Sequence, residues 1–518
     1  MINGAQALIR TLVAAGIDVC FTNPGTSEIH IVAALDAVPE MRAILTTFEG
    51  VATGAADGYA RMADSPAATL LHLGPGLGNG LANLHNARRA RVPVVNIVGD
   101  HARYHTVFDT VLQSDIETVA RNVSSWVRTS SNSEGLARDA VEAIAAATGP
   151  PGQVATLIVP ADVSWEEAAE PAASPQPVAP SPVSPAIVET AATAIRSGRQ
   201  TGILLGGMAL REPGLVAAAR IATASGSKLF AERNMTRLER GAGLPAVERL
   251  AYWPELVSKQ LDGLELLILA GAATPYSSFA YRGKDSCLVP AGCDVHEFAP
   301  PTSDVVTSLE RLVDALDAGD ATAVLQTPAV PPRPEGPLTA EKVCQAVGAT
   351  LPEGAILSDE ALTSALTLPV KTAGAPRHDW LTLTGGAIGQ GLPVAAGAAI
   401  ACPERPVISL QADGSALYTP QSLWTMAREQ LNVTVVIFNN RSYAILNAEF
   451  ARIGVKQAGP RAKAQLELSN PDIEFVALAR GFGVPSRRVD EAEQLTSALE
   501  QAIAEPGPHL IEAVIPGL

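Results

Sequence analysis

The stretch that decides the fold runs from Val407 to Tyr443 and reads VISLQADGSALYTPQSLWTMAREQLNVTVVIFNNRSY. An apolar run near each end of it predicts two buried strands. Between the strands, Ala412–Ser415 predicts a tight turn, and Thr419 followed by Pro420 predicts the start of a helix that reaches about Gln430. The stretch therefore predicts one βαβ unit with parallel strands.

Two polar residues follow these strands directly, Asp413 after the first and Asn440 after the second. Because the carboxyl ends of parallel strands meet at one edge of a sheet, where ligands bind, we expect the two side chains to lie close together. Their oxygens suit a Mg²⁺ ion shared with a phosphate. Gly414 allows close backbone approach, and Ser415 can donate to a phosphate oxygen. The alternative is an ordinary βα turn and an asparagine-rich strand end, because short motifs also match by chance.

The bulk composition excludes several classes of function. A chain of 518 residues is too long for one core, so we expect roughly two to four domains. A net charge of −16 argues against nucleic-acid binding and against anionic membranes. The five cysteines are scattered, which predicts free thiols in a reducing cytoplasm. No signal-peptide cleavage pattern and no unbroken apolar run of about 18 residues is present, so we expect no membrane span.

Two proline-rich linkers, Glu166–Pro185 and Thr327–Pro337, divide the chain. Helix and strand signals alternate in each part, which is typical of a doubly wound parallel sheet. The segments that close the first and third parts, GPPGQVATLIVP and EPGPHLIEAVIP, are similar, as an internal duplication would leave them. We therefore expect an α/β protein with three doubly wound parallel-sheet domains, at residues 1–165, 186–326 and 338–518.

The opening stretch resembles the diphosphate and metal motif of thiamine diphosphate enzymes, in which a G-D-G-S turn, a helix and a strand precede a double asparagine. This chain departs from the motif at Ala412, where the family has glycine. The resemblance implies that Asp413, Asn440 and the backbone carbonyl of Ser442 hold Mg²⁺. The domain layout also resembles the thiamine diphosphate decarboxylase and carboligase superfamily, whose order is a pyrimidine-binding, a middle and a diphosphate-binding domain.

Glu49 is the strongest candidate for catalysis. It follows a predicted strand and begins a helix, and on position alone it is a favourable charge at a helix N-terminus, worth under about 1 kcal/mol. The segment E-x7-D-G-Y-A-R, from Glu49 to Arg61, resembles the family's catalytic glutamate segment. The resemblance implies that this carboxyl, with its pKa raised by burial, bonds the cofactor's pyrimidine ring. A C2 ylid would then attack a 2-oxo acid, and loss of CO₂ would leave an enamine.

Further segments resemble cofactor contacts of the family. Ile388, in GGAIGQGLPVAAG, falls where the family has a bulky apolar wedge under the cofactor, although an isoleucine between glycines usually belongs to a core. The carbonyl of Gly386 is a candidate partner for the cofactor's amino group, and the segment SDEALTS resembles a diphosphate-contacting loop. The residues that the resemblance assigns to cofactor binding are Gly386, Ile388, Gly414, Ser415, Thr363, Ser364, Asn23 and Pro24.

His72 lies near the end of a predicted strand and faces a glycine-rich segment, Gly74–Gly80, that we expect to be a loop. A lone histidine in an apolar strand is more often structural. However, N-P-G-T-S-E together with L-H-x3-G-x-G-N resembles benzoylformate decarboxylase, which has a polar residue at the position of Thr26 and an active-site histidine at that of His72. The resemblance implies that His72 relays protons to the enamine.

Other features favour acetolactate synthases. Gly74-Pro75-Gly76 and the segment around Gln113 resemble theirs, and Gln113 would then point at the substrate. Glu449 stands where an aromatic residue would wall an aryl pocket. Residues 76–80 lack the rest of a dinucleotide fingerprint, which excludes NAD. Leu205–Gly207 resembles the region where acetolactate synthases hold FAD, and FAD binding stays open.

We therefore expect a thiamine diphosphate- and Mg²⁺-dependent enzyme that decarboxylates a small 2-oxo acid in the manner of benzoylformate decarboxylase. The alternative is carboligation like that of acetolactate synthase, in which the enamine adds to a second 2-oxo acid or aldehyde. An inactive cofactor-binding homologue is a third hypothesis. In the family the site forms between the first domain of one subunit and the third domain of another, which implies a homodimer or homotetramer.

Overall fold

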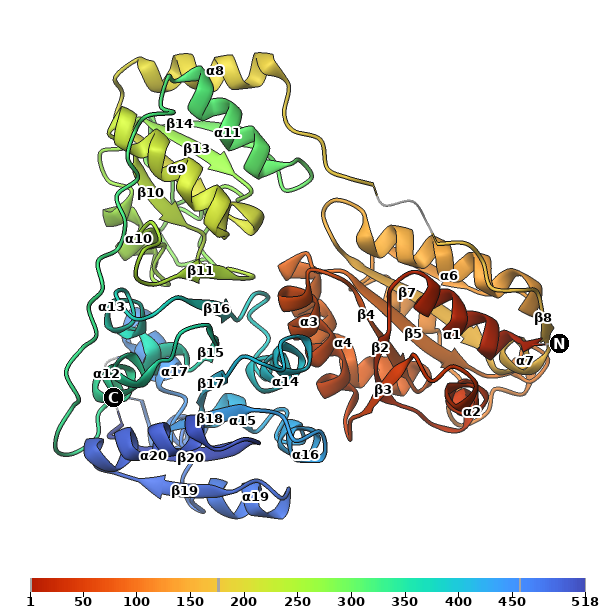
Figure 1. Ribbon diagram of the computed structural model, residues 1–518. Coiled ribbons are helices and arrows are strands. Elements are labelled where there is room, and N and C mark those ends of the chain that lie inside the picture. Colours follow the sequence, from red (N-terminus) through yellow and green to blue (C-terminus); the bar gives the residue numbers. More distant parts are fainter. Residues whose placement is uncertain (1, 175–177, 456–457, 518) are drawn as a thin grey trace.

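The computed structural model describes residues 2–174, 178–455 and 458–517 and contains three large sheets covered by helices (Figure 1). The fold is therefore α/β, as predicted. A short antiparallel pairing of β1 (Ile2–Asn3) with β8 (Glu167–Ala168) lies at the start of the segment predicted to be an irregular linker. All five cysteines are free thiols, as predicted. In the described part of the chain, no helix has the length and apolar character needed to cross a membrane.

The first sheet has six parallel strands in the order β3-β2-β4-β5-β7-β6. Its strand order reverses between β2 and β4, and such a switch point is where open α/β sheets bind ligands beyond the strands' carboxyl ends. The strands are β2 (Val19–Asn23), β3 (Arg42–Leu45), β4 (Ala67–Leu71), β5 (Val94–Asp100), β6 (Trp126–Thr129) and β7 (Val154–Pro160). The helices are α1 (Gly4–Ala14), α2 (Ile29–Ala34), α3 (Glu49–Ala63), α4 (Leu73–Ala90), α5 (Ile116–Ala120), α6 (Ser133–Thr148) and α7 (Ala161–Trp165).

The third sheet has seven strands in the order β11-β16-β15-β17-β18-β20-β19, and its strand order reverses between β15 and β17. Its own strands are β15 (Ala355–Glu360), β16 (His378–Thr382), β17 (Val407–Ala412), β18 (Val433–Asn439), β19 (Ser486–Val489) and β20 (His509–Val514). Its helices are α12 (Ala340–Thr350), α13 (Leu368–Lys371), α14 (Gly391–Ala401), α15 (Asp413–Ala416), α16 (Ser422–Arg428), α17 (Ala444–Arg452), α18 (Pro460–Lys463), α19 (Phe475–Gly481) and α20 (Ala492–Ala504).

The middle sheet has five parallel strands in the order β12-β10-β9-β13-β14. Its elements are α8 (Pro185–Arg196), β9 (Thr201–Leu205), α9 (Glu212–Ser225), β10 (Lys228–Ala231), β12 (Glu248–Arg249), α10 (Pro254–Gln260), β13 (Leu266–Ala270), β14 (Asp294–Ala299) and α11 (Val305–Ala315). Strand β11 (Leu238–Arg240), from this part of the chain, instead pairs antiparallel with β16. The strands of the third domain itself are parallel, as predicted, and the added strand β11 makes the whole sheet mixed.

Two predicted local structures differ from the observed ones. Residues 74–80, expected to be a loop, form the first turns of helix α4. Glycine disfavours helix, but tertiary packing overrides that preference here. A Cβ at Gly76 would lie 2.9 Å from Glu49 Oε1, and one at Gly80 would lie 2.9 Å from Thr53 Cγ2, so glycine at both positions lets α4 pack against α3 without displacing these side chains. The predicted tight turn at Ala412–Ser415 is the beginning of the short helix α15.

Helices α3 and α14 join the first and third domains through direct backbone contact. A Cβ at Gly58 would lie 2.1 Å from the carbonyl oxygen of Val394. A Cβ at Gly397 would lie 1.9 Å from the carbonyl oxygen of Ala55. No larger side chain fits at either glycine, so the sequence of small residues sets how closely these two helices lie.

A buried ion pair lies at the same junction. The Arg61 guanidinium is 1% exposed and donates to both carboxylate oxygens of Asp57, at 2.7 and 2.8 Å. It also donates to the carbonyl of Thr382 at 2.9 Å and to the hydroxyl of Thr384 at 3.0 Å. The side-chain amide of Gln390 donates to Asp57 as well. The ion pair therefore joins α3 to the residues just before and just after the third domain's glycine-rich loop, residues 385–389.

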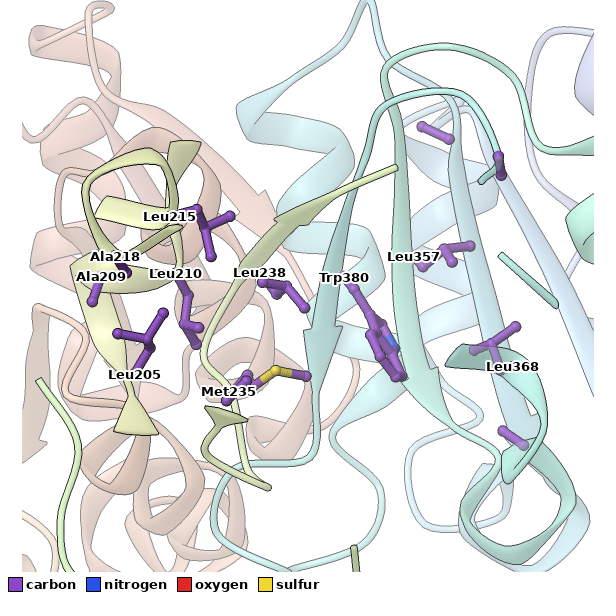
Figure 2. Close-up of a cluster of buried hydrophobic side chains, with 14 of the residues drawn as sticks. Leu205, Ala209, Leu210, Leu215, Ala218, Met235, Leu238, Leu357, Leu368 and Trp380 are labelled. Carbon is purple, nitrogen blue, oxygen red and sulfur yellow. The ribbon is translucent and has the colours of Figure 1, made fainter. Parts of the chain in front are cut away.

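The middle and third domains share one hydrophobic core. Leu205 and Leu210 of the middle domain lie on one side of β11, and Leu357 and Trp380 of the third domain lie on the other (Figure 2). Leu238, on β11 itself, lies between the two groups. Strand β11 thus lies inside the core that the two domains share.

We expect the substitution Arg61→Met to lower the free energy of unfolding by about 3–5 kcal/mol, because it leaves the Asp57 carboxylate buried without a cation. Urea denaturation followed by circular dichroism measures the change. The matched control is Arg121→Met, which removes an exposed i,i+4 pair with Glu117 and should cost less than about 0.5 kcal/mol. A loss for Arg61→Met no larger than that of the control would contradict the role given to this pair.

Candidate active site

Glu49 is the first residue of α3, just beyond the carboxyl end of β3. Its side chain is buried, and one carboxylate oxygen accepts a hydrogen bond from Asn79 Nδ2 at 3.0 Å. Among the described residues, Asn79 is its only side-chain partner. Asn79 is on α4, so the close approach of the two helices orients the carboxylate. The second oxygen, which faces Gly76, keeps hydrogen-bonding capacity for a ligand.

His72 lies at the switch point of the first sheet, immediately before α4. Its Nδ1 is 2.8 Å from Glu28 Oε2, and the Glu28 side chain is fully buried. Glu28 also accepts the backbone N–H of Gly25 at 2.8 Å. Because a carboxylate only accepts, Nδ1 carries a proton and Nε2 of neutral His72 is an acceptor.

Glu28 was not predicted as a site residue. The signal that could have revealed it is its place at the end of the N-P-G-T-S-E segment, but the sequence gives no sign that the histidine 44 positions later is its partner. Thr26, which was predicted, is exposed on the turn. The neighbouring Ser27 comes closer to the imidazole, with its hydroxyl 3.4 Å from Nδ1. Asn23 and Pro24 are half-buried at the end of β2, on the same turn.

Gln113 lies in the segment before α5, beside the start of α4. Its side-chain oxygen is buried and has no hydrogen-bond partner in the described residues. The hydroxyl of the next residue, Ser114, is also buried and unpaired, and a Cβ at Gly74 would lie 1.9 Å from it. Since α4 begins at Leu73, Gln113 belongs to the same edge of the first domain as His72. Its oxygen thus lacks the hydrogen-bond partner that a buried polar atom usually has.

The third sheet brings Asp413 and Asn440 to one edge, as predicted. Neighbouring parallel strands β17 and β18 end with Ala412 opposite Phe438, so both polar residues lie just beyond them. Asp413 is 1% exposed, and burial raises the pKa of its carboxyl despite nearby backbone N–H groups. One of its oxygens accepts the N–H of Gly414 at 2.8 Å, and the other has no partner in the described residues. A buried, unpaired carboxylate oxygen is what a cation site requires.

The remaining predicted residues of this edge surround Asp413. The Asn440 side-chain oxygen accepts the N–H of Ser442 at 2.9 Å. The Ser442 carbonyl accepts the N–H of Ala444 at 2.8 Å. The Ser415 hydroxyl donates to the carbonyls of Ala412 and Glu360, at 3.0 and 3.3 Å. These oxygens fit a Mg²⁺ ion at Asp413 and Asn440, since amide, carboxylate and backbone oxygens are its usual protein ligands.

Glu360, at the carboxyl end of β15, is a second site residue that was not predicted. It is 1% exposed and accepts the backbone N–H groups of Gly389, Gln390 and Gly391 at 2.7, 3.3 and 2.6 Å. Burial raises the pKa of its carboxyl to about 7 in spite of these bonds. It therefore anchors the loop that bears the predicted residue Ile388.

The predicted cofactor-binding residues of the third domain lie around this loop. Gly386 is exposed with φ +79°, a backbone conformation that favours glycine. Ile388 is half-buried. Thr363 is half-buried and Ser364 buried, in the short 3₁₀ helix η5 (Leu362–Ala365) that follows β15.

Within one chain, α4 links the two halves of the site. Asn83 Nδ2 donates to the carbonyl of Gly50 at 2.8 Å and to that of Gly389 at 3.2 Å. Asn86 Nδ2 donates to the carbonyl of Ala387 at 2.8 Å. In the described part of the chain, no hydrogen bond joins Glu49 or His72 to Asp413 or Asn440. The two predicted halves are thus each assembled and are joined through Asn83 and Asn86 of α4, not through their own functional side chains.

Comparison with known proteins identifies the class to which this fold and site belong. Residues 2–120 match the model of the thiamine pyrophosphate enzyme N-terminal TPP binding domain, and residues 366–513 match that of the C-terminal TPP binding domain. The chain belongs to the thiamine pyrophosphate-dependent enzymes, thiamine pyrophosphate being another name for thiamine diphosphate. It is 56% identical over 517 residues to the "Putative acetolactate synthase large subunit IlvX" of Mycobacterium tuberculosis, covering 100% of this chain and 99% of that protein.

More distant relatives include both predicted reaction types. The chain is 28% identical to a benzoylformate decarboxylase of Pseudomonas aeruginosa, over 96% of each protein. It is 26% identical to the acetolactate synthase isozyme 1 large subunit of Escherichia coli, over 99% of this chain and 94% of that protein. A thiamine diphosphate-dependent 4-hydroxybenzoylformate decarboxylase of Rhodococcus jostii has the same fold, with a TM-score of 0.86 at 23% identity and 99% coverage of both chains.

We expect Glu360 to make the stability of the cofactor-free protein depend on pH. Its pKa is about 7 in the folded state against an ordinary 4.5, so between these values the folded state binds more protons than the unfolded state. Its contribution to the free energy of unfolding is therefore largest below pH 4.5 and falls, by roughly 3 kcal/mol at most, as the pH rises through 7.

Urea denaturation between about pH 5 and pH 8 measures this dependence in the wild type and in Glu360→Gln, whose amide does not titrate. The variant should lose part of the decline in stability with rising pH, whereas the exposed control Glu404→Gln should keep it. Identical pH profiles for Glu360→Gln and the wild type would refute the raised pKa.

Proposed function

We propose that this enzyme decarboxylates a 2-oxo acid and transfers the remaining acyl fragment to a second carbonyl compound, the reaction type of acetolactate synthase. The observation that carries the proposal is the 56% identity, over the whole chain, to a protein named as an acetolactate synthase large subunit. The buried, unpaired side-chain oxygen of Gln113 supports it, because it leaves a polar group for a substrate beside the start of α4.

The residues present fit the group that the family requires. When bound, thiamine diphosphate supplies a nucleophilic carbon and an electron sink for loss of CO₂. Asp413 and Asn440 would hold Mg²⁺, and the N-terminal turn of α15 would face the diphosphate. Glu360 fixes the loop that bears Ile388 through three backbone N–H groups, and this loop would support the cofactor.

Glu49 is assigned to hold a proton toward the cofactor's pyrimidine ring. Its carboxylate is buried, one oxygen is oriented by Asn79, and the other retains capacity for a ligand. A shielded carboxyl of this kind can share a proton with a ring nitrogen more strongly than an exposed one.

A second reaction, release of the fragment as an aldehyde, is favoured by the pair His72–Glu28. Glu28 is fully buried and fixes the proton on Nδ1, so Nε2 is free to take and return a proton at the edge of the first domain. Such a relay serves a decarboxylase that protonates its product, the reaction type of the benzoylformate decarboxylases to which the chain is 28% identical.

The middle domain is closely packed at its switch point between β9 and β13. A Cβ at Gly206 would lie 2.7 Å from the carbonyl oxygen of Gly271 and 2.8 Å from Glu232 Oε1. The turns after the two strands thus touch through their backbones, and the Glu232 side chain fills the space beside them. Decarboxylation and acyl transfer involve no net oxidation or reduction, so the proposed reaction needs no redox step through FAD.

The choice between the two reactions is tested by incubating the holoenzyme with pyruvate or with benzoylformate and following the products by NMR. We expect acetolactate from pyruvate, and no acetolactate from Glu49→Gln. Benzaldehyde from benzoylformate without carboligation would support the aldehyde-releasing reaction instead. If neither substrate were consumed while the cofactor bound, both assignments of substrate would be wrong.

Whether two subunits share each site is tested with a heterodimer of Glu49→Gln and Asp413→Asn chains, co-expressed with different affinity tags. Each homodimer should be inactive. If the first domain of one subunit faces the third domain of the other, one site of the heterodimer carries both changes and the other carries neither, so about half of the wild-type activity should return. Activity no higher than that of the homodimers would mean that each site forms within one chain.

A further inference from the structure

Two arginines lie side by side at the carboxyl edge of the middle sheet. Arg233 follows β10, Arg249 ends β12, and these two strands are paired in parallel. Arg249 Nε donates to the backbone carbonyl of Arg233 at 2.8 Å, and Arg233 Nε donates to the Asn234 side chain at 3.0 Å. These bonds hold the two guanidinium groups in place while using only their ε nitrogens.

Neither guanidinium has a carboxylate partner. In the described part of the chain, neither forms an ion pair, and their terminal nitrogens have no hydrogen-bond acceptor. Other arginines of the middle part of the chain are paired: Arg211 with Asp64 at 2.8 Å, and Arg237 with Glu239 at 3.2 Å. Both arginines are half-buried.

Each of the two guanidinium groups also makes a cation–π contact with an aromatic ring. The Arg233 guanidinium lies 4.9 Å from the centre of the Tyr252 ring, and that of Arg249 lies 4.9 Å from the centre of the Trp380 ring. Burial lowers the pKa of both, that of Arg249 to about 10, where the neighbouring charge of Arg233 also contributes. Two like charges held together in a partly buried place favour binding of an anion.

Two acidic groups of this region, Asp359 and Glu449, have hydrogen-bond partners other than Arg233 and Arg249. Asp359 accepts the backbone N–H of Ala361 and Trp380 Nε1, both at 3.2 Å. Glu449 accepts the Tyr281 hydroxyl at 3.0 Å and lies 3.8 Å from Arg452. The charge of Asp359 partly offsets that of Arg249, but in the described residues neither carboxylate forms an ion pair with Arg233 or Arg249.

A third arginine, Arg240, stacks on the same ring as Arg249 but has a structural role. It also stacks on Trp380, at 4.9 Å, but its terminal nitrogens donate to the Thr372 hydroxyl at 3.1 Å and to the carbonyl of Pro369 at 2.7 Å. The terminal nitrogens of Arg240 thus have hydrogen-bond partners, whereas those of Arg233 and Arg249 have none in the described residues.

We propose that Arg233 and Arg249 together form an oxyanion-binding site that takes a carboxylate or phosphate group of a small ligand. Planar guanidinium groups with free terminal nitrogens suit either group, because each can form two parallel hydrogen bonds. The pair lies beside Asp359, one residue before Glu360, and beside Tyr281, which bonds to α17 just after the metal loop. The site does not depend on the proposed reaction, and it is separate from the residues assigned to Mg²⁺.

The site is tested by calorimetry on the holoenzyme, with thiamine diphosphate and Mg²⁺ already bound so that the diphosphate site is filled. The probes are inorganic phosphate, ADP and 2-oxoglutarate, at constant ionic strength. We expect at least one probe to bind with one site per chain, and Arg233→Gln and Arg249→Gln each to weaken it at least about tenfold. Tightest binding of ADP would identify a nucleotide ligand, and tightest binding of 2-oxoglutarate a carboxylate ligand.

The matched control is Arg428→Gln, which removes an exposed arginine that also stacks on a tryptophan, Trp424, at 5.3 Å. It should leave binding of the probe unchanged. If Arg249→Gln fails to fold, Arg233→Gln carries the test, because Arg233 stacks on Tyr252 and not on the core residue Trp380. Absence of binding for all three probes, or equal binding by the wild type and both variants, would overturn the proposal.

Discussion

The contact between helices α3 and α14 is the constraint on which the rest of the site depends. Glycines at positions 58 and 397 allow the two backbones to touch, and the buried pair Arg61–Asp57 lies at the same junction. Since α3 begins with Glu49 and α14 follows the loop that contains Ile388, this one contact sets where both segments lie. A larger residue at either glycine would therefore displace Glu49 and the loop that contains Ile388 relative to one another.

Two buried carboxylates hold other groups of the candidate site in place. Glu28 holds the imidazole of His72, and Glu360 holds three successive backbone N–H groups. Each lies at the carboxyl end of its sheet, at the point where the strand order reverses. All three N–H groups bonded to Glu360 belong to one loop, whereas Glu28 keeps one buried oxygen without a partner in the described residues.

The features that distinguish the two reaction types are local, whereas those that define the class are spread over two domains. His72 with Glu28 supports protonation of a product, and the unpaired oxygen of Gln113 supports recognition of a second substrate. Both lie near the start of α4. Glu449, which in sequence replaces an expected aromatic residue, bonds to Tyr281 of the middle domain, so it fastens α17 to its neighbour.

The sequence by itself determined the α/β class and the meeting of Asp413 with Asn440, because strand periodicity and the rule that parallel strands end at one edge are local in origin. Only the tertiary structure decided that residues 74–80 are helical, since the reason is the close approach of another helix. It also decided that Glu28 and Glu360 belong to the site, because their partners lie far along the chain. Contacts between distant segments leave no periodic trace in a single sequence.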